Sequence, residues 1–162
     1  MATALEPGVT RLGTPSDREV RITRAFDAPR RLVWAAWTSP EHQREWLTGP
    51  PGWTLPVVED DFRPGGKWRR VWRKEDGEEM EMTGVNRVVN PPEKLVSTER
   101  WGPEWPETVN TLEFIEENGR TVVTLTILYP SKEARDAALQ TGMKEGMDIG
   151  FVRLEEYLRK LA

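Results

Sequence analysis

The strongest constraint on the fold is a run of strand-length segments separated by tight turns, which fills the middle of the chain. Most of the turns are of the Pro-Gly, Asp-Gly, Asn-Pro and Asn-Gly types, and such short connections join neighbouring antiparallel strands. We expect these strands at residues 53–62, 67–74, 79–89, 94–101, 108–116 and 120–129. The pattern predicts a curved antiparallel meander whose concave face a helix can cover.

A further strand and two short helices precede the meander. Residues 19–26 alternate between apolar and other side chains, which indicates a strand. Pro29 follows it and fits the first turn of a helix over residues 30–37, and Pro40 does the same for a second helix over residues 41–47. The sheet is therefore expected to contain six to seven strands.

The last thirty residues contain no proline and predict a long amphipathic helix that follows Ser131, a natural N-cap. Within it, Gly142, Gly146 and Gly150 recur every four residues, and each mid-helix glycine costs about 1 kcal/mol relative to alanine. Two explanations remain open. The glycines let the helix backbone approach another element closely, or they leave room for a guest that neighbouring methionines would enclose.

The length of 162 residues favours one domain, expected over residues 17–162. Residues 1–16 are rich in proline and glycine and contain no apolar run of the signal-peptide type. They are expected to form a flexible N-terminal arm.

Charge and the scarcity of two residue types exclude several function classes. The formal net charge is −4 without a basic block, so nucleic acid is not expected as a partner. Cysteine is absent and His42 is the one histidine, which excludes disulfides, thiolate catalysis and Cys or His metal clusters. Neither a metal nor a cofactor is expected. Charges interrupt the C-terminal stretch, so it does not insert into a membrane, and the cytoplasm is the expected compartment.

The segment 67–74 supplies the leading candidate for a binding group. Residues two apart share a side of a strand, so Arg70 lies between Trp68 and Trp72 on one face. If that face is concave, a cation flanked by indoles would orient a carboxylate or an enolate. If it is convex, Val71 points inward instead. The concave placement is favoured, because the aromatic face outweighs a single valine. The full expected ligand-binding set is Trp68, Arg70, Trp72, Met80, Met82, Glu99, Trp101, Met143, Gly146, Met147 and Gly150.

Two other polar features are interpreted as structural. His42 has no G-x-S-x-G partner sequence and sits in the first turn of a short helix, where capping or surface packing is usual. The acidic run Glu59-Asp60-Asp61 is interpreted as the solvated face of a strand next to Arg63, although paired carboxylates also perform acid–base chemistry when burial raises one pKa.

Several short motifs resemble one superfamily over about residues 19–162. Residues 26–34, FDAPRRLVW, resemble the F-x-A-P-x-x-x-V-W opening of START-like (SRPBCC) domains, and residues 39–46 resemble their D-P-E-H-x-x-x-W motif. The stretches RPGGKW at 63–68 and GMKEG at 142–146, with the strand and turn at 84–92, resemble the branch related to the activator of the heat-shock-protein-90 ATPase. The chain departs at residues 46–50, WLTGP, where relatives often read W-W-G-P.

The resemblance implies an α+β helix-grip fold, a curved antiparallel sheet around a long C-terminal helix with an apolar cavity between them. The first functional hypothesis is the binding of a hydrophobic or aromatic small molecule in that cavity, without catalysis, by a monomer or homodimer. Alternatives are a polyketide cyclase or dehydratase-like enzyme using Arg70 and Glu99, and a co-chaperone-like interaction protein using surface aromatics such as Trp53 and Trp105, with a chaperone as partner.

Overall fold

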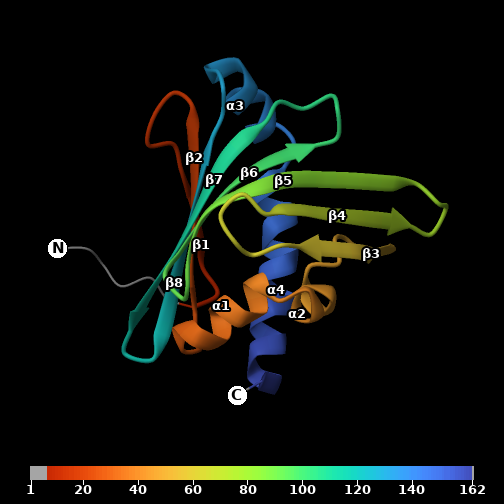
Figure 1. Ribbon diagram of the computed structural model, residues 1–162. Coiled ribbons are helices and arrows are strands. Elements are labelled where there is room, and N and C mark those ends of the chain that lie inside the picture. Colours follow the sequence, from red (N-terminus) through yellow and green to blue (C-terminus); the bar gives the residue numbers. More distant parts are fainter. Residues whose placement is uncertain (1–6, 162) are drawn as a thin grey trace.

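The computed structural model describes residues 7–161, which form an α+β fold with eight strands and four helices (Figure 1). Residues 1–6 of the expected arm, and Ala162, lie outside the described residues. The elements are β1 (Thr10–Gly13), β2 (Glu19–Phe26), α1 (Arg30–Thr38), α2 (Pro40–Trp46), β3 (Trp53–Asp60), β4 (Lys67–Lys74), β5 (Glu79–Asn90), β6 (Lys94–Trp101), β7 (Thr108–Glu117), β8 (Arg120–Leu128), α3 (Lys132–Leu139) and α4 (Met143–Leu161).

All eight strands belong to one antiparallel sheet with the order β1-β2-β8-β7-β6-β5-β4-β3. The chain runs as an uninterrupted meander from β3 to β8, as the short turns predict, and β2 then pairs with β8. Figure 1 shows the sheet bending around α4, with α1 and α2 together near the C-terminal end of that helix. The expected helix-grip fold, with two short helices after the strand at 19–26, is confirmed.

The sheet has one strand more than expected. Strand β1 pairs with β2, with Leu12 opposite Ile22, and it lies within the segment that we expected to be a flexible arm. Strand β1 was missed because its four residues are too few to show the alternation of a strand, and glycine and proline are frequent around them. The two edges of the sheet are β1 and β3, and the register of β3 against β4 shifts between Thr54 and Val57.

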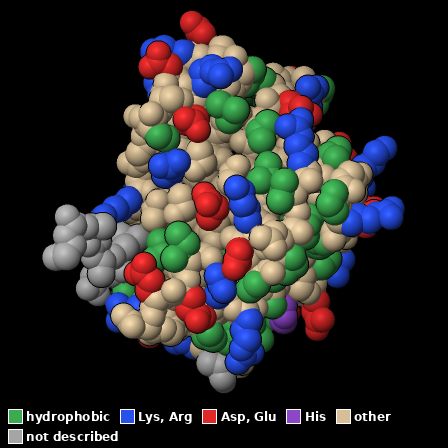
Figure 2. All heavy atoms as spheres, turned by 60° about the vertical axis from the view of Figure 1, so that its left-hand side comes forward, with side chains coloured by type: hydrophobic (Ala, Val, Ile, Leu, Met, Phe, Trp, Pro, Cys, Tyr) green, Lys and Arg blue, Asp and Glu red, His purple; other side chains and the backbone are tan. Residues whose placement is uncertain are grey.

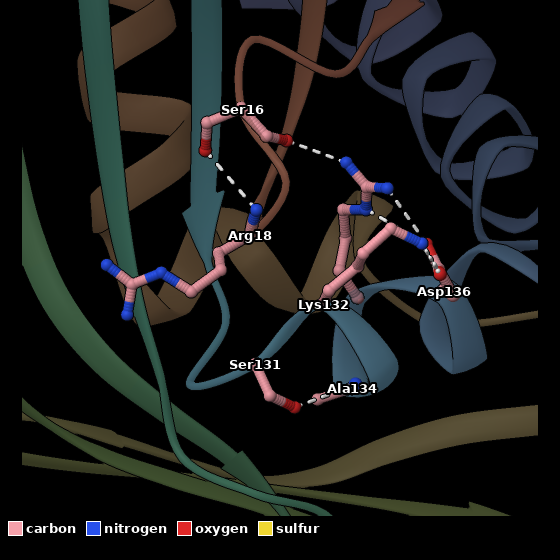
Figure 3. A network of polar contacts seen from close by, with 7 residues as sticks. Ser16, Arg18, Ser131, Lys132, Ala134 and Asp136 are labelled. Carbon is pink, nitrogen blue, oxygen red and sulfur yellow. Dashed lines mark hydrogen bonds and ion pairs between the residues drawn. The ribbon is translucent and has the colours of Figure 1, made fainter.

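The C-terminal stretch forms two helices, so a single helix from residue 131 onward is wrong. Ser131 does cap α3, because its Oγ accepts a hydrogen bond from the Ala134 amide at 3.1 Å (Figure 3). The break comes at Gly142, whose φ of +75° is a left-handed conformation that favours glycine. Gly142 therefore ends the first helix, and of the three glycines expected within one helix only Gly146 and Gly150 lie in α4.

The main core lies between the concave face of the sheet, α1 and α4. Phe26 and Phe114 are fully buried there, and Trp37 packs edge-on against both rings at 6.0 and 5.8 Å. Leu154 of α4 is also fully buried. A smaller cluster of Leu55, Val58, Trp68, Trp72 and Met82 fills the β3–β5 end of the sheet.

A buried arginine ties the sheet to α4. Arg24 of β2 is 3 % exposed, and its Nη2 donates to Glu155 Oε1 at 2.7 Å. Its Nη1 donates to Thr10 Oγ1 at 2.6 Å, while its Nε has no hydrogen-bond partner among the described residues. The hydrogen bond to Thr10 and the ion pair with Glu155 join β1, β2 and α4, which fixes the N-terminal strand against the C-terminal helix.

Candidate functional site

The concave face of β4 carries the aromatic pair that the sequence singled out. Trp68 and Trp72 are 6 % and 4 % exposed, and Arg70 lies half-buried between them. Antiparallel pairing places Arg70 opposite Met82 and Trp72 opposite Met80 on β5. Paired residues share a side of a sheet, so these side chains form one surface.

The far end of this surface reaches solvent. Met80 and Trp101 are 38 % and 39 % exposed. Trp101 stacks on Trp72 with ring centroids 5.5 Å apart and an interplanar angle of 14°. Apolar side chains therefore continue from the interior to the surface along β4, β5 and β6.

Arg70 is held at only one of its nitrogens. The guanidinium carbon lies 4.7 Å from the centroid of the Trp68 ring, a cation–π contact, and Nε donates to Gln43 Oε1 of α2 at 3.3 Å. The two terminal nitrogens make no hydrogen bond or ion pair with another residue in the described part of the chain. Burial lowers the Arg70 pKa from its ordinary value, and the charges of Asp60 and Glu99 oppose that shift.

Asp60 flanks Arg70 on the β3 side, and its interpretation as part of a solvated face is wrong. Asn86 Nδ2 donates to Asp60 Oδ1 at 2.8 Å, and Ser97 Oγ donates to Asn86 Oδ1 at 2.9 Å. Burial raises the pKa of Asp60 to about 6, although Asn86 and Arg70 act in the opposite direction. Asp61 does fit the solvated interpretation, since it is exposed and pairs with exposed Arg63 at 2.8 Å.

Glu99 of β6 flanks Arg70 on the other side. Burial raises the pKa of Glu99, while Arg70 and hydrogen bonds donated by the side chains of Trp101 and Asn110 lower it. Tyr129 follows the end of β8 and is 6 % exposed. Burial and, secondarily, the nearby charge of Glu99 raise the pKa of Tyr129 to about 12, so its hydroxyl keeps its proton. The surroundings of Arg70 are thus more polar than the apolar guest site that we expected.

The C-terminal helix contributes less to this surface than expected. Met143 and Met147 are partly buried and pack against the main core. Gly146 is exposed, and an added Cβ would meet no atom within 4 Å. A Cβ on Gly150 would lie 3.8 Å from the Trp46 ring, which is ordinary packing and leaves no space for a guest there.

Sequence reasoning missed several polar groups of this region. They are Gln43 and Asp60, which act on Arg70, and Asn86, Asn110 and Tyr129, which act on the flanking carboxyls or respond to them. The period of two along each strand contained part of the signal, because Asp60 shares a side with buried Val58, and Tyr129 shares one with Ile127. No local pattern indicates Gln43, which reaches Arg70 from a helix. The single histidine, His42, ties α2 to α4, with its Nδ1 2.5 Å from the Tyr157 hydroxyl.

The chemistry of this surface is that of hydrogen bonds and charge. Within residues 7–161, no group of three or more His, Asp or Glu side chains could hold a metal ion. The helices of this part of the chain are too short or too polar to cross a bilayer. On the face shown in Figure 2, side chains of both charge signs are interspersed.

Comparisons with known proteins agree with the fold described above. The sequence profile of the "Activator of Hsp90 ATPase homolog 1-like protein" family matches residues 27–159. A crystal structure from Rhodobacter sphaeroides is similar, with 28% identity over 93% of this chain and 98% of that one and a TM-score of 0.89. One from Mycobacterium smegmatis has 26% identity over 92% and 96% and a TM-score of 0.81.

At 20% identity, over 89% of this chain and 99% of that one, an AHSA1 protein from Silicibacter pomeroyi shares the fold with a TM-score of 0.71. No curated protein matches the chain. Because the family profile spans most of the sequence, the chain belongs to the Activator of Hsp90 ATPase homolog 1-like family.

Proposed function

We propose that the protein binds a hydrophobic or aromatic small molecule between the concave face of the sheet and the helices that cover it. The observation that carries this proposal is the state of Arg70. Its two terminal nitrogens lack a protein partner within the described residues, although the group sits on an indole among buried side chains. A half-buried guanidinium with free donors is a natural anchor for one polar group of an otherwise apolar guest.

The neighbouring side chains supply the apolar part of the site. Trp68, Trp72 and Met82 are buried beside Arg70, and burial of a guest against them would contribute about 25 cal/mol per Å² of apolar surface. Met80 and Trp101 lie at the exposed end of the same surface, and we assign the entrance to them. Methionine and tryptophan adapt to flat or irregular apolar guests, which favours aromatic or extended hydrocarbon ligands.

Native mass spectrometry of protein purified without detergent tests the proposal. We expect extra mass that is lost on denaturation, and less of it in the Trp101→Glu variant, because a charge then stands at the entrance. The matched control is Trp105→Glu, since Trp105 is 38 % exposed, like Trp101, but lies in the loop between β6 and β7. Equal retention in both variants would contradict the assigned entrance. No retained mass, and no uptake of added aromatic compounds, would contradict the function.

A second candidate is catalysis on a polyketide-like substrate, as a cyclase or dehydratase. The specific support is that two carboxyl groups with raised pKa, Asp60 and Glu99, flank one cation. A carboxyl with a raised pKa is suited to general acid–base catalysis, and Arg70 would stabilise an enolate. A pH–rate profile that did not change in Glu99→Gln would remove that residue from the mechanism.

A third candidate, a co-chaperone-like role, is supported by family membership and by the exposed ring of Trp105. A pull-down with an Hsp90-type chaperone tests it, with Trp105→Ala as the variant expected to lose binding. Undiminished binding in that variant would exclude Trp105 from the contact.

A further inference from the structure

Building on the small-molecule function proposed above, we infer that the guest carries a single carboxylate, which Arg70 binds, and that this anion enters together with one proton, which Asp60 accepts.

The terminal nitrogens of Arg70, Nη1 and Nη2, favour a carboxylate as the group of the guest that they bind. The guanidinium fork presents parallel N–H donors that match the two oxygens of a carboxylate, and such bidentate pairs are the strong hydrogen bonds of proteins. Gln43 occupies Nε, and Trp68 lies against the group at 4.7 Å, so the fork is held while Nη1 and Nη2 stay available. Tyr129 has a hydroxyl without a hydrogen-bond partner among the described residues, close enough to Glu99 to respond to its charge. Its hydroxyl is a second donor near Glu99.

The charges around Arg70 explain why a proton must accompany the anion. With Asp60 and Glu99 both ionised, two negative charges already face one positive charge, and a third negative charge in this half-buried place would be repelled. Protonation of one carboxyl removes that repulsion. The bound anion would therefore raise the proton affinity of the nearest carboxyl, and protonation would tighten anion binding by the same factor.

Asp60 is the group placed to take that proton. It faces Arg70 of β4, Asn86 of β5 and its own neighbour Asp61, while Glu99 of β6 lies on the other side of the guanidinium. Burial already brings its pKa to about 6, so protonation near neutral pH costs little. Glu99 also has a raised pKa, but two side chains, Trp101 and Asn110, donate hydrogen bonds that favour its ionised form, whereas Asn86 alone does so for Asp60 among the described residues.

Isothermal titration calorimetry with 2-naphthoate and the neutral isostere 2-naphthamide tests the inference. If only protein with a protonated Asp60 binds the anion, the Kd for naphthoate should rise about 20-fold between pH 5.5 and pH 7.5, while the Kd for naphthamide stays constant. At pH 6.5, titrations in buffers of different ionisation enthalpy should show uptake of ~0.8 proton per naphthoate. In Asp60→Asn both effects should vanish, whereas the matched control Asp61→Asn should keep them.

The anchor is tested in the same way. Arg70→Gln should weaken naphthoate binding about tenfold or more and leave naphthamide binding nearly unchanged. Its control is Arg69→Gln, which removes the same charge from the neighbouring exposed residue. Circular dichroism verifies that each variant is folded.

Three outcomes separate the two proposals. Naphthoate binding with the expected pH dependence and proton uptake supports the inference. Equal binding of both compounds without pH dependence overturns it and leaves the small-molecule function standing. Failure of wild-type protein to bind either compound overturns the inference and counts against the proposed function as well.

Discussion

Replacing Asp60 by asparagine should change how the stability of the protein depends on pH. The substitution preserves shape, and the asparagine Oδ1 still accepts the hydrogen bond from Asn86. Burial raises the pKa of Asp60 from 3.8 to about 6 in the folded protein. The native state therefore binds the proton more tightly than the unfolded chain does. The contribution of Asp60 to the free energy of unfolding is present at low pH and is lost as the pH rises through about 6.

The size of the effect follows from the same pKa. Between pH 5 and pH 8, a carboxyl whose pKa moves from 3.8 to about 6 changes the free energy of unfolding by about 1.4 kcal/mol. Solvent screens a half-buried group, so we expect about 1 kcal/mol. The free energy of unfolding of Asp60→Asn minus that of wild type should therefore be about 1 kcal/mol higher at pH 8 than at pH 5.

Urea denaturation at a series of pH values measures the difference. The matched control is Asp61→Asn, which alters the adjacent exposed carboxylate and should leave the wild-type pH dependence nearly intact. The reasoning is refuted if Asp60→Asn follows wild type in parallel over this pH range. It is also refuted if Asp61→Asn shows the larger effect.

Further predictions concern the backbone and the core, and each is checked by the midpoint of chemical or thermal unfolding. Gly146→Ala should stabilise the protein by about 0.5–1 kcal/mol, because the added Cβ meets nothing on an exposed helix, whereas Gly142→Ala should destabilise it by about 1 kcal/mol, because φ is +75° there. The reverse order would contradict the described break between α3 and α4. Gly84→Ala should cost several kcal/mol, since its Cβ would lie 1.9 Å from the Thr98 carbonyl oxygen; a loss below about 1 kcal/mol would mean that the strand relaxes easily. Leu154→Ala should cost about 3 kcal/mol, and an unchanged midpoint would place that side chain outside the core.

The sequence predicted the order of the elements well because local signals determine them. Proline and glycine turns set the meander, and Ser131 set the start of α3. The break at Gly142 was missed because a glycine inside an amphipathic pattern fits both a mid-helix position and a helix end. Only the backbone angle distinguishes the two.

The candidate site was predictable where the period of two along a single strand marks it, on β4, β5 and β6. Trp68, Arg70 and Trp72 follow from the period of two along β4. Asp60 reaches Arg70 across β3 and β4, and Gln43 reaches it from α2, so their roles depend on register and on helix placement. An acidic run is also a common solvated feature, which is why local composition favoured the wrong interpretation of Asp60.

The two open edges of the sheet have a consequence for how the protein behaves at high concentration. Unpaired edge strands offer free N–H and C=O groups to other chains and can seed aggregation. Strand β1 limits this risk by being only four residues long, and β3 carries Pro56, which has no N–H to donate, next to its register shift. Pro56 is exposed and thus acts as a gatekeeper against edge-to-edge association. Its replacement by valine would restore a backbone N–H at this position and would remove a safeguard against association through the β3 edge.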